Sequence, residues 1–482
     1  MDFYDIFLAK QLSGQGGGGG SSGDISVESL FVSSNGTYRA PTGKAYSPVT
    51  VSVSGITPTG ILNINANDLY NITSYAYVDV DVPGVIPFGT ITLSSNSTSY
   101  NVANFKYANV SVPEIPSPGI NETILSRTIS GNLSNSTLTD IGEYAFAYCN
   151  NLKSVEFTVC SSIQSNAFVE CWGLETAIFP NCSSVGVRAF YSNLKLTSVS
   201  FPLCERINSY AFAFCTKLPA VNFPECSVIG SYAFSSCSAL SLINFPKCTT
   251  IGSYAFTGNP NLVSASFPSC ETIYHGAFRH CPRLNTVSFP SCTVMSASAF
   301  ESCGSIASIS FPECTVIYSY AFRYCYDASF IASFPKVSII NEEAFRDCHN
   351  IQEAYFPECT AVYSSAFNAC FLLSSIYMPV VKRINHYAFA SCGSISCLSF
   401  PSLEKIYGDG VFRSCHILES LYLTGSSICT LSTMNAFFGT PMSDSSYLGH
   451  YGSIYVPESL VASYKAATNW ANLSDRITAY IE

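Results

Sequence analysis

The sequence predicts a mainly β solenoid with short helical turns, in which each coil takes 22 residues. Two periodic features carry this prediction. All 22 cysteines lie between Cys149 and Cys429, and most are spaced 11 residues apart, so that two cysteine positions fall in each repeat. An Ala-Phe pair recurs twelve times between Phe146 and Phe389, with steps of 22 or 23 residues, and Val411-Phe412 continues the series. A fixed period of this length is typical of solenoids, whose coils each bury an apolar face against their neighbours.

Each repeat is expected to contain one short strand and one compact turn. The repeat that begins at Cys215 reads CTKLPAVNFPECSVIGSYAFSS. Val221 and Phe223 are apolar and are separated by the polar Asn222, as in a strand with one buried face. Pro224 ends this strand because it has no N–H to donate to a ladder. The following I-x-x-Y-A-F stretch is too short for a full helix, so a single helical turn or 3₁₀ piece is expected on the opposite wall.

The replacements at the cysteine positions favour free, buried thiols over a disulfide framework. Where the first cysteine of a repeat is missing, the sequence has Asn193 or Asn259. Where the second is missing, it has Val337, Val381 or Leu403. Obligatory disulfides would not tolerate unpaired replacements scattered in this way, whereas a free cysteine behaves as a small apolar group. We therefore expect the thiols to be reduced and buried.

The repeat pattern A-F-x-x-C-x-x-L-x-x-V-x-F-P resembles the BspA-type subclass of leucine-rich repeats over about residues 138–425. The resemblance implies a leucine-rich-repeat solenoid. It also implies an asparagine/cysteine ladder, in which the first position of each repeat satisfies buried backbone groups at a turn. The expected ladder residues are Cys149, Cys171, Asn193, Cys215, Cys237, Asn259 and Cys281.

Four segments are predicted along the chain. Residues 1–23 combine an amphipathic stretch, expected to form an anchor helix, with the Gly-rich tether 13–23. The apolar residues of the anchor are Phe3, Ile6, Phe7 and Leu12. Residues 24–119 contain three similar units that end in alternating valines, as in Val49–Val53, and are expected to form small β modules of a stalk. Residues 120–425 form the solenoid, and residues 426–482 form a C-terminal capping region.

Two segments outside the repeats resemble accessory proteins of tailed bacteriophages and prophages. The first is GTYRAPTGKAYSPVTVSV, at residues 36–53. The second is IYVPESLVASYKAATNW, at residues 454–470, where a strand over 453–456 and a helix over 457–468 are expected to cover the open end of the solenoid. The resemblance implies a fibre or receptor-binding protein. Such fibres are commonly trimers, although no heptad repeat indicates a homotrimer here.

Composition excludes several classes of function. The formal net charge is -10 and only 11% of residues are charged, so the chain lacks the basic stripe that nucleic-acid binding requires. No apolar run approaches the roughly 20 residues that cross a bilayer, and the first residues do not read as an export signal. No nucleophile motif, paired carboxylates or zinc-type Cys/His spacing stands out. We therefore expect no enzyme activity, no metal and no cofactor.

The outward position of the predicted strands is the candidate binding face. It is small and polar in the middle of the solenoid and aromatic toward the C-terminus. Tyrosine is favoured in interfaces and sugar contacts, whereas the alternative is a solvated strand face without a partner. The candidate residues are Asn222, Asn244, Tyr355, Tyr377 and Tyr422. A second tyrosine row precedes the Ala-Phe pairs and is expected to be structural packing; it contains Tyr144, Tyr210, Tyr232, Tyr254, Tyr320 and Tyr387.

Three functions follow from this organisation. The first is a virion-attached phage fibre, made in the host cytoplasm with reduced thiols. It would dock to a phage structural protein through its N-terminus and bind a host cell-surface protein or glycan through its solenoid. The second is a BspA-type adhesin on the bacterial cell surface. The third is a purely structural spike.

Overall fold

The computed structural model describes seven short strands between residues 30 and 102, residues 131–443 except 137, 144 and 148, and residues 451–481. The chain divides into two compact units. One comprises residues 1–83 and 87–102, and the other comprises residues 84–86 and 103–482. The predicted anchor residues Phe3, Ile6, Phe7 and Leu12 and the tether 13–23 lie outside the described residues.

The strands of the N-terminal unit form two antiparallel sheets, ordered β1-β4-β5 and β2-β3-β6-β7. The strands are β1 (Leu30–Phe31), β2 (Gly36–Tyr38), β3 (Val49–Ser54), β4 (Ile61–Ile64), β5 (Val78–Asp81), β6 (Gly89–Leu93) and β7 (Thr98–Val102). The alternating valines of the first unit (35–53) fall in β3, and Val78 and Val80 of the second unit (58–82) fall in β5. Because β3 pairs with β6 of the third unit (87–112), the sheets do not follow the three units one by one. The domain boundaries remain predictions.

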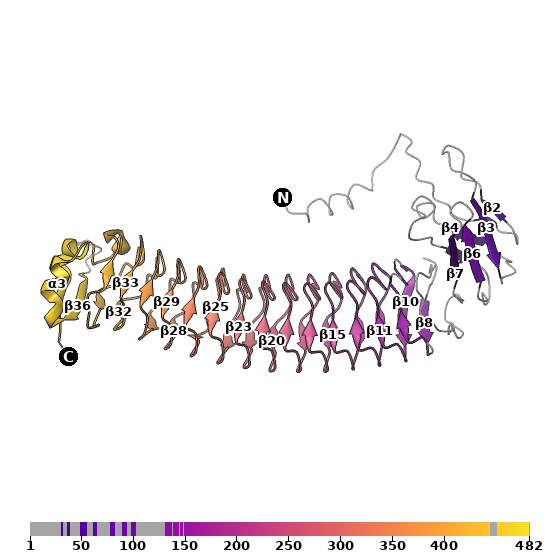
Figure 1. Cartoon of the computed structure of the whole chain (residues 1–482), viewed down its shortest axis with the longest axis horizontal. Helices are drawn as coiled ribbons and strands as arrows, with labels where there is room; N and C mark the ends of the chain where they lie inside the picture. The colour runs from indigo at the N-terminus through magenta and orange to yellow at the C-terminus, as the bar shows by residue number, and fades with distance from the viewer. Residues whose placement is uncertain are drawn as a thin grey trace, which may run out of the picture. The chain divides into compact units, whose positions relative to one another are not determined.

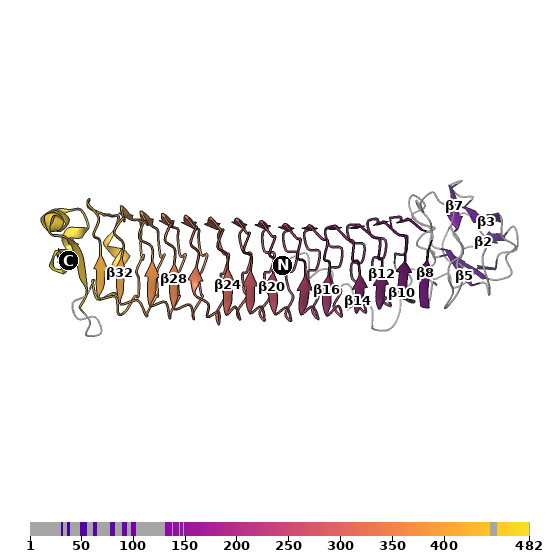
Figure 2. The same ribbon diagram turned by 90° about the horizontal axis from the view of Figure 1, so that it is seen from below.

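The first wall of the solenoid consists of short parallel strands, one from each coil. They lie side by side along the stack (Figure 2). Most pairs join residues 22 apart, such as Ser154 with Thr176. The strands are β8 (Gly131–Asn135), β10 (Leu152–Phe157), β12 (Thr176–Ile178), β14 (Ser198–Ser200), β16 (Ala220–Asn222), β18 (Leu242–Asn244), β20 (Ser264–Ser266), β22 (Thr286–Ser288), β24 (Ser308–Ser310), β26 (Ala332–Ser333), β28 (Glu353–Tyr355), β30 (Ser375–Tyr377), β32 (Cys397–Ser399) and β34 (Ser420–Tyr422).

A second wall is one continuous 14-stranded parallel sheet of two-residue strands. In each of these strands the second residue is buried, as Ile207 is in β15. The strands are β9 (Asp140–Ile141), β11 (Ser162–Ile163), β13 (Ser184–Val185), β15 (Arg206–Ile207), β17 (Val228–Ile229), β19 (Thr250–Ile251), β21 (Thr272–Ile273), β23 (Val294–Met295), β25 (Val316–Ile317), β27 (Ile339–Ile340), β29 (Ala361–Val362), β31 (Arg383–Ile384), β33 (Lys405–Ile406) and β35 (Thr430–Leu431). The predicted fold class, a mainly β solenoid of 22-residue leucine-rich repeats, is confirmed.

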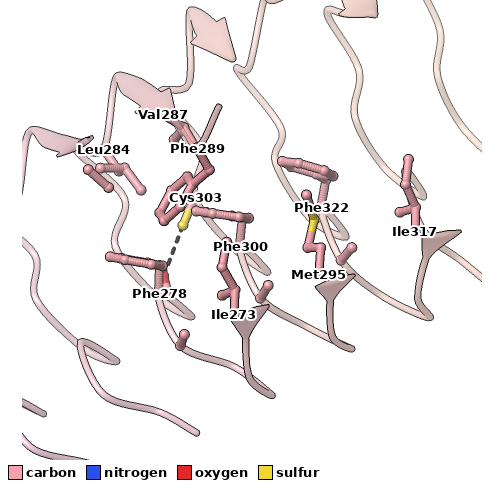
Figure 3. Close-up of a cluster of buried hydrophobic side chains, with 14 of the residues drawn as sticks. Ile273, Phe278, Leu284, Val287, Phe289, Met295, Phe300, Cys303, Ile317 and Phe322 are labelled. Carbon is pink, nitrogen blue, oxygen red and sulfur yellow. Dashed lines mark hydrogen bonds between the residues drawn. The ribbon is translucent and has the colours of Figure 1, made fainter. Parts of the chain in front are cut away.

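Two stacked rows of phenylalanine fill the core between the walls (Figure 3). The Ala-Phe phenylalanines stack on one another, as Phe190 does on Phe212 with ring centroids 5.2 Å apart and planes 2° apart. The phenylalanines at the ends of the first-wall strands form the second row and meet the first edge to face, as Phe201, directly after β14, meets Phe212 at 5.8 Å and 74°. Edge-to-face and offset aromatic pairs add about 0.5–1.5 kcal/mol each beyond area burial. This repeated packing explains why phenylalanine recurs at both positions.

The Tyr-Ala-Phe stretch forms turns, and the expectation of a helical turn or 3₁₀ piece there is wrong. The N–H groups of Tyr210, Phe212 and Phe214 donate to the carbonyls of Ser231, Ala233 and Ser235 in the next coil, at 2.8–2.9 Å. These bonds between coils use N–H groups that a helix would need internally. Tyr210 and Phe214 have φ values of 59° and 61°. Such left-handed conformations cost about 1–2 kcal/mol for a residue with a Cβ, and the bonds between coils offset this cost.

The C-terminal region closes the stack and contains the last helix (Figure 1). Its elements are η1 (Met434–Phe437), β36 (Ser453–Pro457), η3 (Glu458–Leu460), α3 (Val461–Ala466), η4 (Trp470–Arg476) and β37 (Ile477–Tyr480). β36 adds to β34, and β37 adds to β36. Trp470 Nε1 and Asn469 Nδ2 donate to the carbonyls of Cys429 and Leu431, at 2.6 and 2.8 Å. These side chains thus donate hydrogen bonds to backbone carbonyls at the open edge beside β35. The helix α3 is shorter than the predicted helix 457–468.

Candidate functional site

The candidate binding face lies on the first wall, where strand geometry turns alternate side chains outward. In β16, Val221 is buried while Ala220 and Asn222 are exposed. The structure brings Asn222 together with Asn244 of the next coil, since Asn244 Nδ2 donates to Asn222 Oδ1 at 2.7 Å. The two amides are therefore part of a side-chain ladder along the wall, and each retains exposed surface.

Tyr355 and Tyr377 form a stacked pair on paired strands of this wall. They are directly opposite in the register of β28 and β30, with ring centroids 5.2 Å apart and planes 7° apart. Their exposed fractions are 44% and 50%, which is large for aromatic side chains that already have a packing partner. The pair presents an amphipathic surface whose side chains are ordered before any ligand arrives.

Tyr422 belongs to a separate aromatic group, because β32 lies between it and the Tyr355–Tyr377 pair. Its ring stacks on that of Tyr455 in β36, with centroids 4.5 Å apart, and meets Tyr480 edge to face at 5.8 Å. Sequence reasoning did not assign Tyr455 and Tyr480 to the face. The Ser-Ile-Tyr-Val pattern at 453–456 could have placed Tyr455, since it reads as one more strand of the wall.

The first cysteine of each repeat donates from its sulfur to the carbonyl of an Ala-Phe phenylalanine one coil earlier. The Sγ–O distances are 2.9 Å for Cys171 with Phe146, 3.3 Å for Cys215 with Phe190, and 3.1 Å for Cys237 with Phe212. Cys281 makes the same contact to Phe256 at 3.2 Å. Figure 3 shows this bond for Cys303 and Phe278.

Asparagine makes the same contact where it replaces the first cysteine. Asn193 Nδ2 donates to the Phe168 carbonyl and Asn259 Nδ2 to the Phe234 carbonyl, both at 2.9 Å. Cys149, in the first coil, has its Sγ 3.9 Å from the Ala147 carbonyl instead.

The second cysteine of each repeat has a different environment. Except for Cys429 in the last coil, its sulfur lies 3.2–3.4 Å from the carbonyl two residues later, as in Cys160 with Ser162 and Cys226 with Val228. This contact stays within one turn of one coil. An aliphatic side chain fills the same space in Val337, Val381 and Leu403, which are buried.

All 22 cysteines are free, and all are buried except Cys397. Burial raises the pKa of Cys226 and Cys237 from the ordinary 9.0 to about 12. Only the thiolate is a nucleophile or metal ligand. The buried cysteines are therefore inert at neutral pH and act as packing groups and weak donors.

One charged network lies beside the Tyr-Ala-Phe turns. Glu301 has only 3% of its side chain exposed and pairs with Arg279 at 3.0 Å and with Arg323 at 2.6 Å. Arg323 also pairs with Glu343 at 3.0 Å, and Glu343 with Arg346 at 2.9 Å. The Arg323 guanidinium lies over the ring of Tyr320, 4.2 Å from its centroid. Opposite charges thus neutralise one another inside this cluster.

The predicted structural row of tyrosines stacks beside the same turns. Tyr210 and Tyr232 have ring centroids 4.7 Å apart, and Tyr232 and Tyr254 have centroids 4.8 Å apart. Tyr144 lies outside the described residues.

No three His, Cys, Asp or Glu side chains in the described ranges gather in a way that could hold a metal ion. Every helix among those residues is too short or too polar to cross a membrane.

Comparison with known families decides the identity of the repeats. The family described as "BspA type Leucine rich repeat region" matches residues 127–228, 205–329 and 315–442, in six copies. The chain belongs to this family. The matched residues contain both walls of the solenoid and the two cysteine positions of the BspA-type repeat.

A solved structure shows the same fold. This BspA-type chain is similar to a leucine-rich repeat protein from Bacteroides ovatus, with 20% identity and a TM-score of 0.57, over 83% of this chain and 99% of that one. It also matches a leucine rich cell surface protein from Faecalibacterium prausnitzii at 19% identity, with a TM-score of 0.38, over 82% of this chain and 98% of that one. No curated protein matches the chain. The resemblance to phage accessory proteins remains a prediction.

Proposed function

We propose that this BspA-type protein is a bacterial surface adhesin whose solenoid binds another macromolecule through the first wall. The stacked, exposed pair Tyr355–Tyr377 is the observation that carries the proposal. Family membership supports it, as does the word "surface" in the name of the Faecalibacterium protein. The role is that of a non-catalytic scaffold.

The first wall suits binding because its exposed groups are already ordered. Tyr355 and Tyr377 stack on each other, and Asn222 and Asn244 are hydrogen-bonded. Fixing a flexible side chain at an interface costs about 0.5–1.5 kcal/mol, and a preformed ladder avoids most of this cost. Leu242, which is 64% exposed beside Asn244, adds apolar area to the polar middle of the wall. Tyrosine at the centre of an interface is a common binding hot spot.

The test compares binding of labelled full-length protein to bacterial and epithelial cells. We expect the double variant Tyr355→Ser/Tyr377→Ser to bind at least about tenfold more weakly, because the loss of two central aromatic contacts costs roughly 2 kcal/mol or more. The matched control is Tyr210→Ser/Tyr232→Ser, which removes a stacked tyrosine pair beside the turns. Equal binding by all three proteins would exclude the first wall as the adhesive face.

A second candidate is a virion-attached fibre, a homotrimeric receptor-binding protein with the same solenoid at its tip. Its support is the sequence order of amphipathic segment, Gly-rich tether and β units, together with the segment at 454–470. Immunoblotting of purified virions and of phage-free bacterial surfaces separates the two. Presence in virions that disappears when residues 1–23 are deleted supports the fibre, whereas presence on phage-free cells supports the adhesin. Failure of the protein to bind any cell would favour a purely structural spike.

A further inference from the structure

A row of exposed tyrosines follows the strands of the second wall, at every second coil. Each tyrosine comes directly after the inward residue of a two-residue strand, and its exposed fraction is between 36% and 47%. Polar residues occupy the same position in the coils between them. The tyrosines are Tyr274, Tyr318, Tyr363 and Tyr407, and the residues between them are Ser296, Asn341 and Asn385.

The solenoid does not require tyrosine at this position. Gly186, Gly230 and Gly252 occupy it in the N-terminal half, where the backbone of the preceding coil comes so close that an added Cβ would meet backbone atoms at 2.4–2.6 Å. Paired strands lie about 4.8 Å apart, so tyrosines in alternate coils recur about every 10 Å. That interval is close to the length of one extended disaccharide. A regular spacing of ring faces suits a ligand that is itself a repeating polymer.

Two cations lie side by side between the last two tyrosines. Arg383 of β31 and Lys405 of β33 are directly paired in the register of the sheet. Like charges in this position are destabilising. Neither side chain forms an ion pair with a carboxylate in the part of the chain that the structure describes. The neighbouring Lys382, by contrast, pairs with Glu404 at 3.1 Å. This is an uncompensated basic pair on a chain whose net charge is -10.

The tyrosines and Asn385 hold the two cations in place. The Arg383 guanidinium carbon lies 6.0 Å from the ring centroid of Tyr363 and 5.2 Å from that of Tyr407. Lys405 Nζ lies 4.7 Å from the Tyr407 centroid. Arg383 Nε donates to Asn385 Oδ1 at 2.8 Å. This bond uses Nε only, so the Nη groups of the guanidinium are left for a bound anion.

We propose that the surface formed by Tyr363, Arg383, Lys405 and Tyr407 binds an acidic, linear, β-linked polysaccharide. The carboxylate of one sugar lies between Arg383 and Lys405, and the neighbouring sugars contact the parts of Tyr363 and Tyr407 that remain exposed. The regular tyrosine row leading to this surface favours a polysaccharide over an acidic peptide, whose side chains would not repeat at the same interval. The site is on the second wall and does not depend on binding by the first wall.

The experiment measures binding of the full-length protein to hyaluronate and to polyglucuronate by calorimetry at low ionic strength. Both probes carry carboxylates on a linear chain. We expect Arg383→Gln/Lys405→Gln to lose at least about tenfold in affinity, since two charge-assisted contacts are removed. We also expect the affinity of the unaltered protein to fall as salt is raised. The swapped variant Arg383→Lys/Lys405→Arg keeps both charges and should bind with intermediate affinity.

Arg206→Gln is the matched control, because Arg206 is an exposed cation at the same position of β15 with no tyrosine beside the strand. It should bind as the unaltered protein does. Three results would overturn the proposal: no binding to either polysaccharide, equal losses in Arg206→Gln and the double variant, or equally tight binding of poly-glutamate. Thermal unfolding of each variant, followed by circular dichroism, shows that any loss of affinity does not arise from unfolding.

Discussion

The side-chain nitrogen of Asn193 lies 2.9 Å from the carbonyl oxygen of Phe168, in the position that a cysteine sulfur occupies in other coils. However, the asparagine amide also carries an oxygen, which needs a hydrogen-bond donor at this position. Asn193 Oδ1 is buried and has no hydrogen-bond partner among the described residues. Asn259 has the same unpartnered oxygen. A thiol supplies the donor without adding a strong acceptor, which explains the preference for cysteine.

Replacing Asn193 with cysteine should therefore stabilise the protein. An unsatisfied buried polar group costs about 1–3 kcal/mol, and the thiol retains a weaker bond to Phe168. We expect Asn193→Cys to raise the free energy of unfolding by about 1 kcal/mol, as measured by urea denaturation. Asn193→Ala is the control, since it removes both the orphaned oxygen and the donor. A cysteine variant no more stable than the alanine variant would show that the donor contact contributes nothing.

Thiol reactivity should separate one cysteine from the rest. In the native state at neutral pH, we expect a thiol-specific reagent to modify Cys397, which is exposed on the first wall. The other cysteines are buried and should react only in denaturant, where all 22 titrate without added reductant. Mass spectrometry of the modified peptides identifies the site, and Cys397→Ser should abolish the native reaction. Fewer free thiols in denaturant would instead reveal disulfides.

Alkaline pH should unfold the solenoid. Burial raises the pKa of Cys226, Cys248 and Cys292 from 9.0 to about 12. Between these values the folded chain keeps protons that the unfolded chain has lost, so stability is complete below pH 9 and falls as the pH rises toward 12. Over this range, each such thiol lowers the free energy of unfolding by about 1.4 kcal/mol for every pH unit. Circular dichroism should show cooperative loss of structure above about pH 9.

A triple variant tests whether the thiols cause this transition. Cys226→Val/Cys248→Val/Cys292→Val removes three of the titrating groups and uses the residue already present at Val337 and Val381. Its unfolding midpoint should move to higher pH. An unchanged midpoint would assign the transition to other groups.

The buried carboxylate of Glu301 should contribute more to the free energy of unfolding than an exposed carboxylate does. Glu301→Ala leaves the partly buried Arg323 without one of its two acidic partners, and breaking a buried pair costs about 3–5 kcal/mol. The control is Glu225→Ala, which breaks an exposed pair with Lys247 and should cost no more than about 1 kcal/mol. Denaturant unfolding measures both. Similar costs for the two variants would mean that the Glu301 network is as weakly stabilising as a surface ion pair.

Much of the fold could be predicted from the sequence, because the same side chains recur at the same positions of each coil. A period of 22 requires residues such as Phe190 and Phe212 to stack, and it brings Asn222 beside Asn244. The replacements Val337 and Val381 indicate, from the sequence alone, that the second cysteine position is apolar. The expected free state of the cysteines agrees with the structure.

The contacts that are not periodic were decided by the tertiary structure. The turns at Tyr210 and Phe214 bond to the next coil, and no local pattern distinguishes them from a short helix. The stack of Tyr422 on Tyr455 depends on a segment that returns to the wall after 33 residues. In the sequence, the row that ends at Tyr407 appears only as tyrosines that recur at every second coil.

The sequence by itself determined the period, the inward residues and the family, because a repeated coil can bury its apolar positions in only one way. Only the tertiary structure decided which contacts the outward side chains make. The period of 22 residues places Arg383 beside Lys405, but only the coordinates show that both cations lie near the ring of Tyr407 and that Arg383 also lies near Tyr363. Outward positions carry no burial constraint, so their chemistry depends on which neighbours the stacked coils bring together.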